Sequence, residues 1–473
     1  MAAVSLLHLL VVILVSAPAA AAQYLGVNYG TLGDNLPPPH RGMELARSAG
    51  AVSVRFYDVN ATLLAAAAAS GLDFVPSFPN DLIPSLASSQ RAADALVAAT
   101  LLPFRGNPRL RYLFIGNEFL SNPTAKPSWP LIVPAMANAA RALRRHGLAH
   151  VKVSTTLSMN DLGTTVLPPS SGAFRPEIAE AVMRPMLGFL ERTGSCLFLD
   201  AYTYFTWSSN HSIFPLPYAL LEPSPPAGFA YHDPGTGLSY ANLLDQMLDT
   251  AVAAMCRLGH CGVGLALAET GWPTAGDLDQ FGANVRNAAT YNRNLARRLA
   301  SGAGTPRRPG VPVPALVFAL FNEDLKWGPD TERHWGLFYP NGSAVYEVDL
   351  TGRRPMASYP PLPPVMNEQP YRGPLWCVVR TSERAGHYVK NETAVREQVA
   401  AVCTDDDGLC DAVRPGGACF LPNTLAAHAS YVFSAHWNRF SEDYGACYFG
   451  GWGTETTIDP SHGSCKFPSI HLK

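Results

Sequence analysis

The sequence predicts an α/β protein in which a (β/α)8 barrel, or TIM barrel, is followed by a small disulfide-rich module. Strand-like and helical runs alternate over about 330 residues. A proline-rich stretch then follows, and six of the nine cysteines lie after it. A doubly wound open sheet is the alternative, but the first strand-like run continues as GVNYGTLG, which lacks the GxGxxG phosphate turn of that fold.

The predicted strands are short apolar runs that end in polar or aromatic residues. They are Tyr24–Gly30, Ser53–Asp58, Asp73–Phe78, Leu110–Glu118, His150–Ser158, Cys196–Phe205, Val263–Trp272 and Ala315–Glu323. Helical patterns between them cover Pro39–Ala49, Asn60–Ser70, Gln90–Leu101, Ser128–Arg145, Pro176–Arg192, Tyr240–Arg257 and Phe281–Ala300. Eight βα units close a barrel, and its active site lies where the strands have their carboxyl ends.

The chain begins with a predicted signal peptide, residues 1–22. An apolar run, VSLLHLLVVILV, is followed by the small residues SAPAAAA. No later run is apolar over the roughly 20 residues of a membrane span. We therefore expect a secreted, soluble protein, and the sequons at Asn60, Asn210, Asn341 and Asn391 are candidate glycosylation sites.

Composition excludes several classes of partner. Charged residues make up 15% of the chain and the formal net charge is −2, so no strong field favours nucleic acid or an anionic membrane. The histidines and cysteines lack the spacing of metal ligands, and no cofactor fingerprint is present. We expect a monomer that needs neither a metal nor a cofactor.

The predicted domains are the barrel at 23–350, a linker at 351–374 and a cysteine-rich module at 375–473. The linker carries seven prolines in 24 residues, which predicts a stiff, extended segment. Three bridges are expected in the module, with pairing left open, among Cys377, Cys403, Cys410, Cys419, Cys447 and Cys465. Cys196, Cys256 and Cys261 are an odd set, so at least one thiol should be free or buried.

Two carboxylates end predicted strands that face each other across the barrel mouth. Glu118 closes the fourth strand, and Glu269 closes the seventh, in ALAETGWPTAG. Both side chains can reach a shared centre, which is the arrangement that hydrolyses glycosidic bonds when one carboxyl is protonated and the other ionised. Asn117 is suited to bind a sugar 2-hydroxyl. A separation of about 5–5.5 Å between the carboxyls would make the reaction retaining.

In combination, ALAETGWPTAG, FIGNE, VRFYD and FALFNEDLKWGPDTERHWGLFYPNG resemble the plant glucan endo-1,3-β-glucosidases of glycoside hydrolase family 17. The resemblance covers about residues 24–350. It implies that Glu269 is the nucleophile and Glu118 the acid/base. One departure is DAYTYF, with Asp200 where the family usually has Asn, which could shift the pH profile or weaken a sugar contact.

The resemblance also implies roles around the two carboxylates. Glu323, Lys326 and Glu332 match a charged cluster beside the acid, in which Lys326 would hold the carboxylates in place and tune the pKa of Glu118. Tyr57 and Tyr202 would orient the nucleophile. The flat side chains expected to stack on sugars are Tyr29, Trp207, Trp272 and Trp335.

The C-terminal module resembles the family 43 carbohydrate-binding modules over about residues 375–465, through WCV, CFLPNTLAAHASYVFSAHW, CYFGG and DPSHGSC. The implied ligand is β-1,3-glucan, to which the module would tether the barrel. Candidate stacking residues, each of which could instead pack in the core, are Tyr431, Phe433, Trp437, Phe440 and Phe449.

The sequence therefore predicts an endo-hydrolase of internal β-1,3-glucosidic bonds, secreted to the cell wall or apoplast, with the vacuole as the alternative destination. Two other functions stay open. A catalytically weak wall-glucan binding protein would retain glucan without releasing reducing ends, and Asp200 is its only support. A transglycosylase would pass the intermediate to a sugar hydroxyl and make products longer than the substrate.

Overall fold

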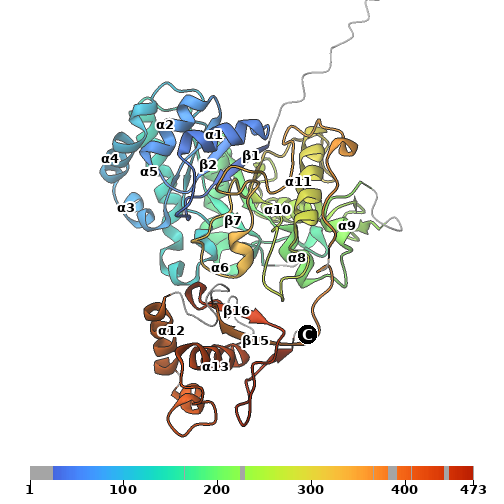
Figure 1. Ribbon diagram of the computed structural model, residues 1–473. Coiled ribbons are helices and arrows are strands. Elements are labelled where there is room, and N and C mark those ends of the chain that lie inside the picture. The colour runs from blue at the N-terminus through green and yellow to red at the C-terminus, as the bar shows by residue number, and fades with distance from the viewer. Residues whose placement is uncertain are drawn as a thin grey trace, which may run out of the picture.

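The computed structural model describes residues 25–163, 166–223, 229–365, 367–381, 391–405, 407–440 and 447–471. The predicted signal peptide lies outside these residues. Within them, no helix has the length and apolar character needed to cross a bilayer. A barrel forms the upper part of Figure 1, and a smaller C-terminal domain, residues 374–471, lies below it.

The barrel is built from two parallel sheets. Two of the predicted strands are each divided, with one half in each sheet. One sheet has the order β3-β2-β1-β14-β11-β8-β7, and the other has the order β4-β5-β6. β3 and β4 are halves of one predicted strand, separated at Pro76, and β6 and β7 are halves of another, separated at Thr155. Joining the halves closes a ring of eight strand positions, so the predicted (β/α)8 barrel is confirmed.

The barrel strands are short and mostly buried. They are β1 (Leu25–Tyr29), β2 (Ser53–Phe56), β3 (Asp73–Val75), β4 (Ser77–Phe78), β5 (Tyr112–Ile115), β6 (Lys152–Ser154), β7 (Thr156–Ser158), β8 (Cys196–Asp200), β11 (Gly264–Thr270) and β14 (Ala315–Val317). The split at Pro76 has a simple cause, because proline has no N–H to donate to a sheet ladder. Its carbonyl still accepts a hydrogen bond of 3.0 Å from the amide of Phe114.

Helices surround the barrel (Figure 1). They are α1 (Pro39–Ser48), α2 (Ala61–Ser70), α3 (Ile83–Ser88), α4 (Gln90–Thr100), α5 (Ile132–Arg145), α6 (Pro176–Ile178), α7 (Arg184–Thr193), α8 (Thr203–Ser209), α9 (Leu216–Ala219), α10 (Leu243–Arg257) and α11 (Val285–Ala300). Asparagine caps begin several of them: the side chains of Asn60, Asn242 and Asn284 accept from backbone amides of α2, α10 and α11. Short hairpins are formed by β9 (Tyr231–His232) with β10 (Ser239–Tyr240), and by β12 (Gly304–Thr305) with β13 (Arg308–Pro309).

One predicted strand is too long. The run Cys196–Phe205 ends as a strand at Asp200, and helix α8 begins at Thr203. Tyr204 and Trp207 of α8 are both 3% exposed. Their spacing of three residues places them on one helical face that packs into the core. The aromatic residues after Asp200 are therefore spaced as on a helix, and the prediction that the strand continues to Phe205 is wrong.

An apolar layer fills the inside of the barrel below the polar mouth. It consists of Val75, Phe114, Phe198, Ala266 and Ala268, which come from four different strands. The barrel interior is therefore packed with side chains and leaves the carboxyl ends of the strands for polar groups.

The C-terminal domain is a three-stranded antiparallel sheet with two helices. β15 (Pro374–Val379) lies between β16 (Gly453–Thr456) and β17 (Ile470–His471), and α12 (Glu392–Asp405) and α13 (Leu425–Arg439) pack nearby. Phe433 and Phe449 stack at 3.9 Å inside it, and both are buried together with Trp437. These three aromatic side chains belong to the core of the domain, so they do not offer a face to a sugar.

The structure pairs the cysteines. The C-terminal domain has Cys377–Cys447, Cys403–Cys410 and Cys419–Cys465. The barrel has Cys256–Cys261, and Cys196 is a free, half-buried thiol. Because the domain has a small core, bridges that restrict its unfolded chain compensate for the limited apolar surface that it buries.

The segment that joins the two domains is fastened to the barrel. The guanidinium of Arg286 on α11 donates to the carbonyls of Leu362 and Pro363 at 3.2 and 2.9 Å. The side chain of Asn367 donates to the carbonyl of Ala283 at 2.9 Å and accepts from Asn284 at 3.0 Å. The predicted linker is therefore an extended segment bound along the barrel.

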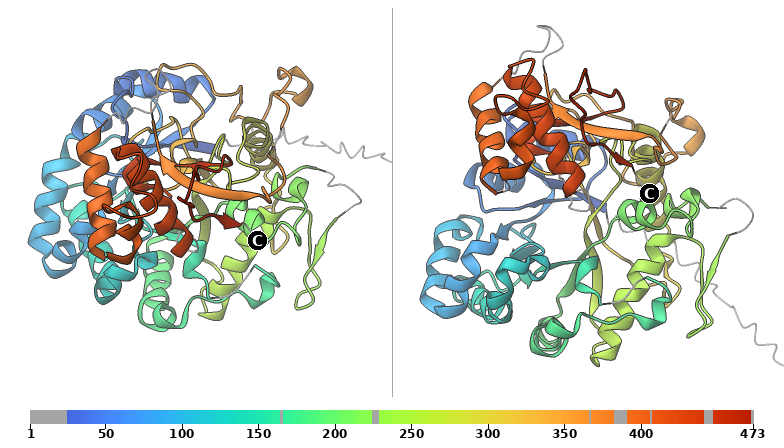
Figure 2. Two further views of the ribbon diagram at one scale, coloured as in Figure 1. Left: turned by 60° about the horizontal axis from the view of Figure 1, so that its bottom comes forward. Right: turned by 90° about the horizontal axis from the view of Figure 1, so that it is seen from below.

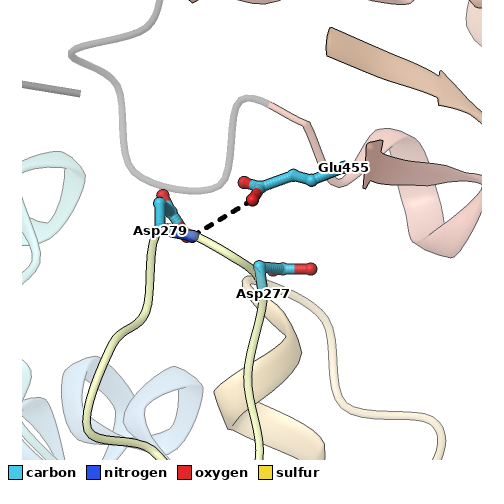
Figure 3. Close-up of side chains that lie close together, drawn as sticks. All are labelled: Asp277, Asp279 and Glu455. Atoms are coloured by element: carbon cyan, nitrogen blue, oxygen red, sulfur yellow. Dashed lines mark hydrogen bonds between the residues drawn. The ribbon is translucent and has the colours of Figure 1, made fainter. Parts of the chain in front are cut away.

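The C-terminal domain contacts loops at the carboxyl ends of the strands, and the two views of Figure 2 place it over that end of the barrel. The hydroxyl of Tyr448 donates to the carbonyl of Lys326 at 3.3 Å. Nearby, the amide of Asp279 donates to Glu455 at 3.2 Å. Asp277, Asp279 and Glu455 each offer a carboxylate oxygen, and these oxygens lie within 4.8 Å of one another (Figure 3).

Raising the pH is expected to weaken this contact between the domains. Burial and the repulsion of its neighbours raise the pKa of Glu455 to about 9, and the pKa of Asp279, at the exposed edge of the cluster, is raised as well. The carboxyl groups therefore bind protons more tightly when the domains are in contact than when they are apart. As a result, the contact becomes less stable as pH rises from about 4, the ordinary carboxyl range, through the raised pKa values. Other charged groups that act on the cluster through Asp277 are Asp330, Arg333 and Arg380.

Hydrogen exchange of residues 277–280 and 453–456 would test this expectation at pH 5 and pH 9. A Glu455→Gln variant is the matched control, because comparing the two proteins at one pH removes the intrinsic pH dependence of exchange. Wild type should exchange faster than the variant at pH 9, where its ionised cluster repels. Equal exchange at pH 9 would contradict the expectation.

Candidate active site

Glu118 follows β5 in a tight turn that the sequence GNE forms. Gly116 and Glu118 both have positive φ, 73° and 45°. A Cβ on Gly116 would lie 2.6 Å from the side-chain oxygen of Asn80, so this position requires glycine. The amide of Glu118 donates to the hydroxyl of Thr156 at 3.0 Å. A left-handed glutamate is a strained conformation of the kind that clusters at functional sites.

Glu269 lies near the end of β11, where the strand has a bulge. Leu267 pairs with Leu199 of β8, but Glu269 pairs with Asp200, so β11 has one residue more than β8 between these positions. A bulge re-aims the side chain that follows it. Gly271 then allows close approach, because a Cβ there would lie 2.4 Å from the carbonyl oxygen of Phe318.

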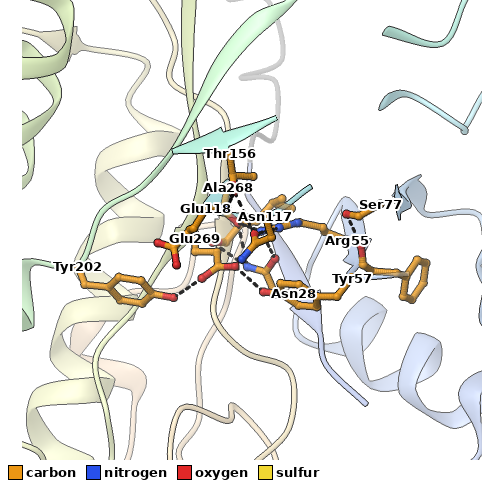
Figure 4. Close-up of polar contacts among 12 residues, drawn as sticks. Asn28, Arg55, Tyr57, Ser77, Asn117, Glu118, Thr156, Tyr202, Ala268 and Glu269 are labelled. Atoms are coloured by element: carbon orange, nitrogen blue, oxygen red, sulfur yellow. Dashed lines mark hydrogen bonds and ion pairs between the residues drawn. The ribbon is translucent and has the colours of Figure 1, made fainter. Parts of the chain in front are cut away.

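Three side chains donate hydrogen bonds to the carboxylate of Glu269 (Figure 4). Arg55 and Tyr57 reach Oε1 at 2.9 and 2.7 Å, and Tyr202 reaches Oε2 at 2.6 Å. Glu269 is 6% exposed. A buried carboxylate that accepts from a guanidinium and two hydroxyls is held as a fixed anion.

Glu118 is in a different environment. Burial, together with the charges of Glu269, Asp161 and Glu332, raises the pKa of Glu118 to about 8 against the opposing effect of Arg55. Among the described residues, no hydrogen bond to the Glu118 carboxyl is found. The site therefore holds one carboxyl ionised and keeps its neighbour protonated at neutral pH.

Asn117 is oriented by its side-chain oxygen. This oxygen accepts from Arg55 and, at 3.0 Å, from the hydroxyl of Thr156. No acceptor for its NH2 group is found in the described part of the chain, so the amide nitrogen is the group left to donate to a ligand.

Arg55 is a site residue to which the sequence analysis assigned no role beyond its place in VRFYD. It is fully buried on β2, and it contacts Glu269 and Asn117 as well as Asn28 at 3.4 Å. Its guanidinium lies over the ring of Phe114, at 5.2 Å, and so on top of the apolar layer of the barrel. The sequence could have indicated this role, because an arginine inside a short buried strand requires an anionic partner.

The charged cluster predicted after the eighth strand is divided in two. Lys326 forms an ion pair of 2.9 Å with Glu332, whereas Glu323 accepts a hydrogen bond of 2.8 Å from the amide of Leu32. Lys326 lowers the pKa of Glu323, although burial raises it overall. For Glu118, Arg55 is a cation that lowers the pKa, and the tuning by Lys326 stays a prediction.

The four side chains predicted to stack on sugars are buried in the structure. Tyr29, Trp207, Trp272 and Trp335 are 3%, 3%, 0% and 2% exposed. The indole of Trp272 donates to the carbonyl of Gly282 at 2.8 Å and packs against Trp207. An aromatic ring needs an accessible face to stack on a sugar. The stacking prediction is therefore corrected: these four side chains are packed in the interior of the barrel.

Asp200, the departure from the family pattern, lies at the end of β8 beside Glu269. It is 2% exposed, and neither carboxyl oxygen forms a hydrogen bond of good geometry with the described residues. Burial and the charges of Glu269 and Glu118 raise its pKa well above the ordinary range. The raised pKa favours the neutral acid form of Asp200, which resembles the amide of asparagine in charge and shape.

Comparison with known proteins gives matches over both domains. Residues 25–350 match the family described as glycosyl hydrolases family 17, and residues 375–454 match the X8 domain. The chain is 42% identical over 453 residues to "Probable glucan endo-1,3-beta-glucosidase A6" of Arabidopsis thaliana, covering 95% of this chain and 92% of that protein. It is 34% identical over 478 residues to a "Glucan endo-1,3-beta-glucosidase" of Triticum aestivum, covering 98% and 99%.

Two solved structures resemble the barrel. One is CJP38, a beta-1,3-glucanase and allergen of Cryptomeria japonica pollen, with a TM-score of 0.65, 37% identity and coverage of 69% of this chain and 99% of that one. The other is a plant beta-glucan endohydrolase, with a TM-score of 0.61, 36% identity and coverage of 68% and 99%.

Proposed function

The chain belongs to the glycosyl hydrolases family 17, and from this premise we propose that it hydrolyses internal 1,3-β-D-glucosidic linkages of β-glucan with retention of configuration. One observation carries the proposal. At the carboxyl ends of the barrel strands, Glu269 is fixed as an anion by Arg55, Tyr57 and Tyr202, while the pKa of Glu118 is raised. Two carboxyls with different protonation states are what double displacement at a sugar requires.

In the first step, a carboxylate oxygen of Glu269 forms a bond to C1 of the sugar. The bond from C1 to the leaving oxygen breaks, and Glu118 transfers its proton to that oxygen. The positive charge that develops on the sugar lies beside the anion of Glu269 and the neutral acid of Asp200. The NH2 group of Asn117 is available for the 2-hydroxyl, a contact that strengthens in the transition state.

In the second step, water attacks C1 and Glu118 accepts the proton that the water loses. The same residue can act as a base because its environment has changed. Once Glu269 is esterified its negative charge is gone, and with it a main cause of the raised pKa of Glu118. The pKa of Glu118 therefore falls in the intermediate, where its carboxyl is ionised and ready to accept the proton.

Around this site we assign the remaining parts of the chain. Residues 1–22 are a signal peptide, 23–350 the catalytic barrel, 351–374 the connecting segment, and 375–473 a carbohydrate-binding module of family 43 type that binds β-1,3-glucan. The protein is a secreted monomer of the cell wall. The exposed side chains of Asn60, Asn341 and Asn391 support glycosylation at these sequons, and Asn210 is the half-buried fourth.

The proposal is tested by incubating the purified full-length protein with a soluble β-1,3-glucan. Reducing ends should appear together with oligosaccharides of intermediate length, and NMR should show that they form first as β-anomers. Glucan retained without new reducing ends would instead indicate a binding protein. Products longer than the substrate would indicate a transglycosylase.

Replacing Tyr202 by Phe is expected to reduce kcat by about 10- to 100-fold, because a hydrogen bond to a charged group contributes about 1.5–3 kcal/mol. The fold should be unaffected. The matched control is Tyr218→Phe, which removes another buried hydroxyl that donates, at 2.8 Å, to Gln246. Wild-type kcat in Tyr202→Phe, measured on soluble glucan, would contradict the orienting role.

A further inference from the structure

The loop after β14, residues 322–336, is held on both sides of its exposed centre. On one side the amide of Leu325 donates to the carbonyl of Leu32 at 3.0 Å, and Asp324 accepts from the side chain of Asn35 at 3.0 Å. On the other side the amide of Asp330 donates to Asp277 at 2.8 Å. The backbone of this loop is therefore fixed relative to the barrel.

Trp327 is at the centre of the loop and is 77% exposed, although the C-terminal domain contacts the same loop. The loop is closed beneath it by the guanidinium of Arg333, which donates to the carbonyls of Lys326 and Gly328 at 3.0 and 3.1 Å. Leu325 of the same loop and its hydrogen-bonded neighbour Leu32 are also exposed, by 57% and 48%. Exposed apolar side chains that gather in one place are typical of a binding surface.

The loop that carries Trp327 is linked to the catalytic groups through packed side chains. Lys326, which precedes Trp327, lies over the ring of Phe318, at 4.3 Å. That ring contacts Tyr57 and Tyr202 edge-on at 6.4 and 6.2 Å. Both tyrosines donate to the nucleophile proposed above. Packed side chains therefore connect the base of this loop, at Lys326, to the reacting centre.

We propose that Trp327 is a sugar-binding subsite outside the catalytic pair, where its indole stacks on a glucosyl unit of a bound β-glucan chain. The C–H faces of a β-glucosyl ring are apolar and flat enough to cover an indole, while the hydroxyls at the rim stay in water. This inference rests on the proposed function. It provides the flat exposed face that the buried tryptophans of the barrel do not.

The subsite also lies at the boundary with the C-terminal domain. Tyr448 contacts the backbone of Lys326, and its ring is covered by the guanidinium of Arg333 at 5.2 Å. A chain that extends from the catalytic carboxylates over Trp327 therefore runs toward that domain. Only a glucan chain that extends beyond the two sugar units at the catalytic carboxylates can reach Trp327. The contribution of Trp327 to binding should therefore increase with the length of the glucan.

Binding is tested first in an inactive Glu269→Gln background by calorimetry with a soluble β-1,3-glucan. Adding Trp327→Ala should weaken the affinity by about tenfold. Adding Trp327→Phe should retain most of it, because a flat ring remains. The control is Val311→Ala, which removes an exposed apolar side chain (48%) before the amino end of β14, at the opposite end of the barrel from the catalytic carboxylates. An affinity that Trp327→Ala leaves unchanged would overturn the inference.

Kinetics of the otherwise wild-type protein provide the second test. Trp327→Ala should raise KM for the polymer by about tenfold and leave kcat nearly unchanged, since the indole is outside the reacting centre. An aryl β-glucoside that occupies only the catalytic pair should show no change. A loss on both substrates would mean that the loop is disturbed and would overturn the subsite. Wild type that neither binds nor cleaves glucan would instead overturn the proposed function.

Discussion

Replacing Glu269 by Gln is expected to reduce the release of reducing ends from soluble β-1,3-glucan by about 10⁴-fold or more. An amide has nearly the shape of a carboxylate but is not nucleophilic, so the covalent intermediate cannot form. The loss should exceed that of the Tyr202→Phe variant, because the tyrosine only positions the group that reacts. Thermal unfolding of Glu269→Gln serves as the control for folding, and activity above about a hundredth of wild type would exclude Glu269 as the nucleophile.

A Glu269→Ala variant makes the same assignment through its product. The truncated side chain leaves room for azide, which can attack C1 of an activated aryl β-glucoside from the side that Glu269 occupied. One displacement at C1 inverts the configuration, so the expected product is the α-glucosyl azide. Formation of the β-glucosyl azide would contradict the role of Glu269.

Replacing Glu118 by Gln is expected to reduce hydrolysis of the polymer by about 10²- to 10⁴-fold, the range for a general acid and base. The raised pKa keeps Glu118 protonated at neutral pH, and wild-type activity should fall as pH rises through about 8, where the acid loses its proton. The variant should lack this decline. It should be measured on the polymer and on an aryl glucoside whose leaving group needs no proton.

The two substrates distinguish the acid from the nucleophile. With the aryl glucoside, Glu118→Gln should still form the covalent intermediate rapidly and hydrolyse it slowly, so mass spectrometry should detect a glucosylated protein. Wild-type rates on the polymer, or no labelled protein with the aryl glucoside, would contradict the assignment. The Glu269→Gln variant provides the matched control, because it should not be labelled.

Much of the site follows from local sequence. Glu118 and Glu269 end apolar runs, and eight such runs close a barrel, so their meeting at one mouth is a consequence of topology. Tyr57 and Tyr202 also follow strands, and the structure places their hydroxyls on Glu269. What local sequence does not specify is the direction of each side chain, and the bulge in β11 sets that for Glu269.

The burial of the aromatic residues depends on the whole chain and not on the local motif. The motif ETGWP puts Trp272 beside a catalytic residue, yet its indole turns into the core, where it is 0% exposed. Trp327, in a polar loop that is typical of a surface, presents its ring to solvent. Glu455 comes near Asp279 only because the C-terminal domain contacts the barrel, and no periodicity in either segment carries that information.

Leu362, Pro363 and Asn367 are bound to α11 and to the residues just before it, which bears on how the proposed second site contributes to binding. A freely moving linker lets a second site search a volume, and its length then sets the effective concentration of that site. Here the hydrogen bonds to the barrel restrict the orientation of the proposed second site before any glucan binds. Avidity should therefore be selective for glucans whose shape fits both sites at once, and it should be insensitive to lengthening of the chain after residue 367.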